Sequence, residues 1–133
     1  MLTRHLRMIR IARDLAVAAH RDIDCYYQLC ALVVKKNRVL SVGYNNPKTH
    51  PRASRTKMKQ LHAEIDAIIR CDDPMGAELI VVRARRDHMI GMAKPCVACE
   101  AMIRQVGIKK VYYTTYCPDW NFPLVEFMDF RNN

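Results

Sequence analysis

The spacing of hydrophobic residues divides the chain into helical and extended segments. Near the start, apolar side chains recur at intervals of three and four residues, which predicts an amphipathic helix. Its expected buried face comprises Met8, Ile11, Ala12, Leu15 and Ala19. Two runs rich in β-branched residues follow, 29–34 and 39–44, and the polar residues 35–38 between them predict an antiparallel hairpin. Residues 45–60 are polar and contain two prolines, so we expect a loop there.

The second half of the chain alternates between helix and strand. Apolar positions within 61–71 predict a second helix, and 79–82 read as a short buried strand followed by a loop through Lys94. Pro95 suits the first turn of a third helix, which we expect to end at Gly107. The expected inner face of this third helix comprises Ala98, Ala101, Met102 and Val106.

Two segments near the end of the chain complete the pattern. Residues 110–114 predict a strand, whereas 124–130 fit either a strand or a helix. Strands joined through helices lie parallel, and the opening hairpin adds an antiparallel pair. We therefore expect an α/β fold, a three-layer α/β/α sandwich with a central mixed sheet of about five strands. The length of 133 residues fits a single domain spanning 1–133.

Composition narrows the function. The 22 Lys and Arg residues against 13 Asp and Glu give a net charge of +9, which favours an anionic partner such as a nucleotide or nucleic acid. No apolar run approaches the roughly 18 residues of a membrane span, so we expect no membrane partner. Arginines are frequent in residues 1–21, as in a mitochondrial presequence, but the helical pattern there indicates folded protein. The six cysteines predict no disulfide framework, which fits a reducing, cytoplasmic location.

Two short motifs carry the chemistry. The first is His62-Ala63-Glu64, at the expected start of the second helix, and the second is Pro95-Cys96-Val97-Ala98-Cys99, at the start of the third. Helices that connect parallel strands begin at the same edge of the sheet. We therefore expect His62, Cys96 and Cys99, at the starts of the second and third helices, to converge. One imidazole and two thiolates suit tetrahedral Zn²⁺ and leave one coordination position open, as in catalytic sites. Glu64 could then move protons to and from water.

The two motifs match the H-x-E and P-C-x-x-C signature of zinc-dependent nucleobase deaminases. The chain resembles the cytidine and deoxycytidylate deaminase superfamily over roughly residues 4–115. The resemblance implies that His62, Cys96 and Cys99 bind Zn²⁺, that Glu64 is the catalytic proton shuttle, and that water replaces the amino group of cytosine or adenine. It also implies assembly into a homo-oligomer. Within the superfamily, a histidine at the position of His62 favours the deoxycytidylate branch, or branches acting on tRNA or single-stranded DNA.

The resemblance also implies substrate contacts. Asn45, with Asn46 as the second choice, is expected to contact the sugar or the base, and the backbone around Ala63 to hold the polar edge of the ring. The loop before the second helix contains several cations and no acid. Either these cations are a solvated surface, or one or two of them hold a substrate phosphate. The candidates for that role are Lys48, Arg52 and Arg55.

Three functions remain open on the sequence. The first is a free-nucleotide enzyme that converts a cytosine nucleotide, dCMP above all, to the uracil nucleotide with release of ammonia. The second is a deaminase of single-stranded DNA or tRNA, which the charge of +9 fits better. That function also calls for aromatic stacking, and the chain has a single Trp. The third is a catalytically silent zinc-binding module, against which the presence of Glu64 argues.

Overall fold

The computed structural model describes residues 3–20, 28–45 and 62–131, which form three helices and six strands. Asn46, Lys48, Arg52 and Arg55 therefore lie outside the described residues. The elements are, in chain order, α1 (Thr3–Ala19), β1 (Gln28–Lys35), β2 (Arg38–Tyr44), α2 (Ala63–Ile69), β3 (Glu78–Ala84), β4 (Ile90–Gly91), α3 (Val97–Gln105), β5 (Lys110–Thr114) and β6 (Val125–Asp129).

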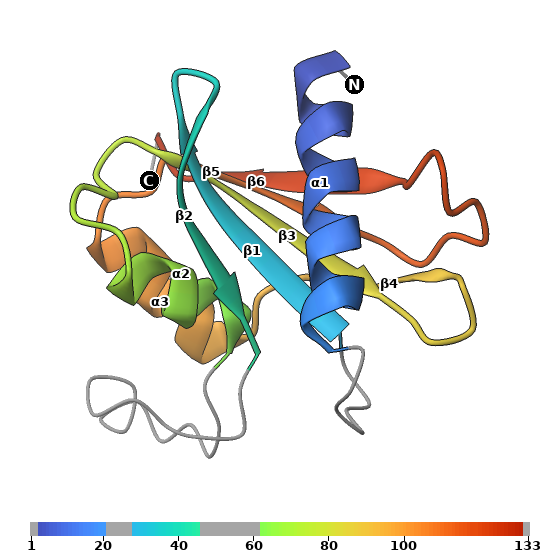
Figure 1. Cartoon of the computed structure of the whole chain (residues 1–133). Helices are drawn as coiled ribbons and strands as arrows, with labels where there is room; N and C mark the ends of the chain where they lie inside the picture. Colours follow the sequence, from blue (N-terminus) through green and yellow to red (C-terminus); the bar gives the residue numbers. More distant parts are fainter. Residues whose placement is uncertain (1–2, 21–27, 46–61, 132–133) are drawn as a thin grey trace.

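The strands form one mixed sheet in the order β2-β1-β3-β5-β6, with the short β4 paired to β3 (Figure 1). β3 and β5 are parallel, and the other pairs are antiparallel. The predicted hairpin of β1 and β2 is confirmed. Lys36 and Asn37 connect its strands with φ angles of 52° and 64°, the backbone conformation that a tight two-residue hairpin requires.

Helices cover both faces of the sheet, which confirms the three-layer α/β/α arrangement. Side chains alternate along β1, so Leu32 packs against α1 while its neighbour Val33 packs against α2 and α3. The two hydrophobic clusters are separate: one contains Met8, Ile9 and Ala12 of α1, and the other contains residues of both later helices. Figure 1 shows α1 on one side of the sheet and the α2–α3 pair on the other.

Two predicted helix faces are partly wrong. Ile11 of α1 is 40% exposed, and the buried face contains Ile9 and Ala16 instead. Ile11 lies about 100° around the helix from buried Ala12, and this rotation carries it away from the sheet. Ala101 of α3 is also exposed, because the buried face of that helix is centred on Cys99 and Ile103. Apolar residues that fit the helical period do not all face the sheet, because packing of the helix on the sheet determines which side is buried.

The remaining element boundaries differ from the predictions in small ways. The segment 83–94, where a loop was expected, contains a two-residue strand, β4, because a pair of residues is too short to show periodicity. α3 begins at Val97, so Pro95 precedes its first turn. The helix ends as predicted at Gly107, whose φ of 86° permits the hydrogen bond from Ile108 N–H to the Ile103 carbonyl. Residues 125–129 form a strand antiparallel to β5.

The structure bears on two further expectations. Within the described ranges, no helix has the length and apolar character that crossing a membrane needs. Five cysteines are described, and all five are free thiols: Cys30, Cys71, Cys96, Cys99 and Cys117. Free thiols at these positions agree with the prediction that they belong to no disulfide framework.

Candidate active site

His62 and Cys96 occupy equivalent positions, each at the N-cap of its helix. The backbone of both residues is extended, with φ and ψ of −82° and 152° at His62 and −71° and 169° at Cys96. Neither side chain forms a capping hydrogen bond with its own helix, although N-cap side chains commonly do so. Instead, the two side chains approach each other across the gap between α2 and α3, as the sequence predicted.

Cys99, one turn into α3, completes a three-residue cluster. Its Sγ lies 3.2 Å from Nδ1 of His62, and Sγ of Cys96 lies 3.6 Å from the same nitrogen. The three atoms all lie within 4.8 Å of one another. Zn²⁺ bound tetrahedrally at about 2.0–2.3 Å would separate its ligand atoms by roughly 3.5 Å. The cluster therefore fits a zinc ion, and its three donors leave a fourth position for water or substrate.

The electrostatics of the cluster also favour a cation. Burial raises the pKa of the Cys99 thiol, and the nearby Glu64 and Cys96 raise it further by their negative charge. Burial lowers the pKa of His62, which favours the neutral imidazole that binds metals. A divalent cation would offset the negative charges and stabilise the thiolates. Binding of a cation would therefore favour the thiolate form of Cys99 that a metal site requires.

Glu64 lies beside the cluster, in the first turn of α2, and only 5% of its surface is exposed. Burial raises the pKa of its carboxyl group from 4.5 to about 6, although hydrogen bonds from its own backbone N–H and from the Cys99 thiol oppose the shift. A carboxyl group with a pKa near 6 can both accept and return a proton close to neutral pH. Glu64 is therefore suited to proton transfer at this site.

Close packing of β2 against α2 holds the first motif in place. Gly43 of β2 contacts the backbone of α2 at Ala63 and Ala67, and there is no room for a Cβ atom between them. Two residues earlier, the Ser41 hydroxyl donates a 2.7 Å hydrogen bond to the Ala67 carbonyl. The glycine was not among the predicted site residues, although a glycine inside a strand is a known signal of close backbone approach.

Asp66 connects the same helix to the end of β2. Its carboxylate accepts hydrogen bonds from the Tyr44 N–H at 2.9 Å and from the Arg70 guanidinium at 3.0 Å. Asn45, which follows Tyr44, accepts a 3.0 Å hydrogen bond from the Leu29 N–H at its side-chain Oδ1. These contacts hold the backbone of Tyr44 against α2 and the side chain of the predicted substrate residue Asn45 against β1. Ala63 is fully buried in the first turn of α2, directly beside His62.

Thr114 holds the segment that leads into the second motif. It is fully buried at the end of β5, and its hydroxyl donates a 2.9 Å hydrogen bond to the Gly91 carbonyl. Its own carbonyl accepts the Ala93 N–H at 2.9 Å. The chain between β4 and Cys96 is thereby attached to β5. No pattern in the sequence indicates this role, since it depends on pairing between strands that are distant along the chain.

We predict that removing one thiol of the cluster removes the metal. Cys99→Ala should purify with far less than one equivalent of zinc, because two donors rarely hold Zn²⁺. Cys71→Ala is the matched control. Cys71 packs against the hydrophobic cluster that contains Cys99, but it is not one of the three metal donors. Metal analysis of both purified proteins checks this. Equal zinc content in the two variants would contradict the assignment of Cys99 as a ligand.

Comparisons with known proteins agree with this site. Residues 2–115 match the family described as the cytidine and deoxycytidylate deaminase zinc-binding region. Deoxycytidylate deaminase of Mycobacterium phage D29 is 32% identical over 122 residues, covering 74% of this chain and 88% of the phage protein.

Solved structures add to the agreement. The dCMP deaminase of cyanophage S-TIM5 in apo form aligns with a TM-score of 0.57 and 26% identity, covering 86% of each chain. The structure of that enzyme in complex with dCMP and dUMP aligns with the same TM-score and 25% identity, covering 85% of this chain and 82% of that one. The chain belongs to the cytidine and deoxycytidylate deaminase zinc-binding family, and it is a zinc-dependent deaminase.

Proposed function

We propose that the protein converts dCMP to dUMP with release of ammonia. The observation that carries this proposal is the convergence of His62, Cys96 and Cys99 next to the buried carboxyl group of Glu64. The relatives support the choice of substrate, since the curated phage relative is a deoxycytidylate deaminase and the cyanophage structure holds dCMP and dUMP. We therefore propose a cytosine nucleotide, and not an adenine nucleotide, as the substrate.

We assign the roles of the residues from the two motifs and from the family resemblance. His62, Cys96 and Cys99 hold Zn²⁺, which when bound supplies Lewis-acid activation of water at neutral pH. Glu64 takes a proton from that water at its carboxylate as the water oxygen adds to C4 of cytosine. The same carboxyl group gives this proton to N3 of the ring, and it then moves the second proton from the added oxygen to the departing amino group, so the bond between C4 and nitrogen breaks, the C4 carbonyl forms and ammonia leaves. The backbone at Ala63, with Asn45 or Asn46, positions the base and sugar.

A substrate phosphate would distinguish a nucleotide enzyme from a nucleoside enzyme. Lys48, Arg52 and Arg55 stay our candidates for that contact, on the sequence alone. We predict that replacing Arg52 and Arg55 together by alanine raises KM for dCMP by about tenfold or more, because a charged hydrogen bond contributes about 1.5–3 kcal/mol. KM for deoxycytidine should change little. Steady-state kinetics with both substrates checks this, and equal effects on the two would rule out a phosphate contact at these residues.

Deamination of a polynucleotide is the second candidate, and the net charge of +9 favours it. A mononucleotide needs fewer positive charges than the chain carries. The two candidates differ in one measurable ratio, kcat/KM for dCMP against kcat/KM for a cytosine-containing single-stranded oligonucleotide. We expect dCMP to be the better substrate, and the reverse order would assign the protein to nucleic acid.

The organisation of the protein is proposed on similar grounds. We infer a single domain over residues 1–133, a homo-oligomer and a cytoplasmic location. The exposed side chains of Phe122, Leu124 and Phe127 along and before the edge strand β6 support self-association, because large exposed apolar groups often mark interfaces. Size-exclusion chromatography coupled to light scattering measures the oligomeric state directly.

A further inference from the structure

A cavity of about 320 Å³ lies at the end of the sheet opposite the metal cluster. The tip of the β1–β2 hairpin and the start of β3 meet there, whereas α2 begins at the other end (Figure 1). We call it the lysine cavity, and it is lined by Val34, Lys35, Lys36, Gly76, Glu78 and Lys109. Its volume is close to the lower bound of known small-molecule sites, about 300 Å³, so it suits a compact ligand.

The positive charge of the lysine cavity is only partly neutralised. Lys35 forms an ion pair with Asp73 at 3.0 Å, but the Asp73 side chain is 75% exposed and is weakly held in such a setting. Lys36 and Lys109 are exposed, and neither forms an ion pair with any residue in the described part of the chain. Two ammonium groups therefore remain available to an anion at the mouth of this cavity.

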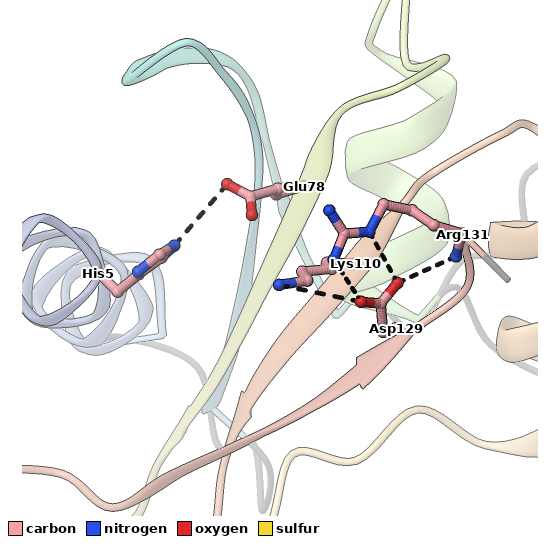
Figure 2. Close-up of polar contacts among 5 residues, drawn as sticks. All are labelled: His5, Glu78, Lys110, Asp129 and Arg131. Atoms are coloured by element: carbon pink, nitrogen blue, oxygen red, sulfur yellow. Dashed lines mark hydrogen bonds and ion pairs between the residues drawn. The ribbon is translucent and has the colours of Figure 1, made fainter. Parts of the chain in front are cut away.

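Glu78 is the one acidic residue in the lining of the cavity. Its carboxylate points toward His5 of α1, with Oε1 3.7 Å from Nε2 (Figure 2). Arg131 lies close enough that Glu78 contributes to its raised pKa, after the larger effect of Asp129. The three lysines thus outnumber the single carboxylate of the lining, which also lies near the Arg131 guanidinium.

The carboxylate of the nearby Asp129 already forms ion pairs with other basic residues. This carboxylate lies 2.6 Å from the Arg131 guanidinium and 4.0 Å from the Lys110 ammonium group, and Figure 2 shows both basic side chains beside it. These hydrogen bonds from Arg131 hold the pKa of Asp129 well below its usual range. Asp129 is therefore not a counter-ion for Lys36 or Lys109, and the end of the sheet keeps an excess of positive charge.

We propose that the lysine cavity is a second anion site, which binds a phosphate group or a short phosphate chain separately from the substrate. Ammonium groups on flexible stems act as point charges for phosphate oxygens and do not require a fixed geometry. The ligand is free inorganic phosphate or polyphosphate, or the phosphate end of a nucleotide. The base of a nucleotide would extend beyond the cavity, since the volume accommodates little more than the phosphates.

Titration of the zinc-loaded protein, followed by amide NMR, tests this proposal. Inorganic phosphate, tripolyphosphate and a nucleoside triphosphate are added separately, with sodium chloride added to a reference sample at equal ionic strength. We expect saturable shifts at the amides of Lys36, Gly76 and Lys109. Similar affinity for tripolyphosphate and the nucleoside triphosphate would identify the phosphate chain as the ligand. Markedly tighter binding of the nucleotide would show that its base or sugar contributes.

Charge-reversal variants complete the test. Lys36→Glu and Lys109→Glu should each weaken tripolyphosphate binding by about tenfold or more, since each removes a charged contact. Lys94→Glu makes the same change of charge near the metal cluster and should leave the binding at the lysine cavity intact. Zinc content and thermal unfolding verify that each variant is folded. Absence of saturable shifts, shifts confined to residues around Ala63 and Val97, or unchanged affinity in both cavity variants would overturn the proposal.

Discussion

Glu64→Gln is expected to lower kcat for dCMP by roughly 10²- to 10⁴-fold while the protein retains its zinc. The amide has nearly the shape of the carboxyl group but can neither accept a proton from water nor return it to the amino group. His62, Cys96 and Cys99 are untouched, so metal content should equal that of the wild type. Steady-state kinetics and metal analysis of the same preparation provide the comparison. Near-normal activity would disprove the assigned role.

The stability of the metal-free protein provides a control for this variant. Burial raises the pKa of Glu64 from 4.5 to about 6, so the folded state binds a proton more tightly than the unfolded state does. Stability from this group is therefore present below pH 4.5 and decreases as the pH rises toward 6. Glutamine carries no charge, so metal-free Glu64→Gln should be at least as stable as the wild type at pH 7. Urea unfolding then separates lost chemistry from lost structure.

Gly43→Ala should have the largest effect on the structure of the site. A Cβ atom at Gly43 would overlap the backbone N of Ala67 and the carbonyl O of Ala63, and it would lie 2.8 Å from the Ala67 Cα. These are backbone atoms of α2, so the helix itself would have to move. Overpacking of this kind costs typically about 1–3 kcal/mol, and a rigid backbone neighbour places this case at the upper end. We also expect weaker zinc binding, because His62 immediately precedes α2.

Gly76→Ala is the matched control for that variant. Its Cβ position has no heavy atom within 4 Å, and the only penalty is the left-handed φ of 77°, which costs about 1 kcal/mol. Zinc affinity should be unchanged in Gly76→Ala and reduced in Gly43→Ala. Urea unfolding and competition with a chelator measure the two quantities. Equal zinc affinity in both variants would show that contact between β2 and α2 does not position His62.

Local patterns in the sequence were sufficient for much of the fold. The β1–β2 hairpin follows from two β-branched runs separated by polar residues, and the end of α3 follows from Gly107. The convergence of His62 with Cys96 and Cys99 followed from a general property of βαβ units, without any knowledge of the distances. Each of these features depends on residues that are close together in the chain or on a rule of topology.

Other features depend on contacts that no local pattern encodes. The exposure of Ile11 reflects the rotation of α1 on the sheet, which is set by packing of the whole face. The role of Thr114 requires β4, a strand of two residues, to pair with β3 beside the end of β5. The fit of Gly43 against α2 depends on the separation of two backbones. Tertiary packing determines these details, so no pattern of neighbouring residues in the sequence predicts them.

Product analysis by mass spectrometry tests the proposed activity most directly. Zinc-loaded wild-type protein and Glu64→Gln are each incubated with dCMP, deoxycytidine and a cytosine-containing single-stranded oligonucleotide. We predict that the wild type converts dCMP to dUMP with the release of ammonia, that the other two substrates react far more slowly, and that Glu64→Gln forms almost no product. Conversion of the oligonucleotide while dCMP stays unchanged, or no difference between the two proteins, would contradict the proposal.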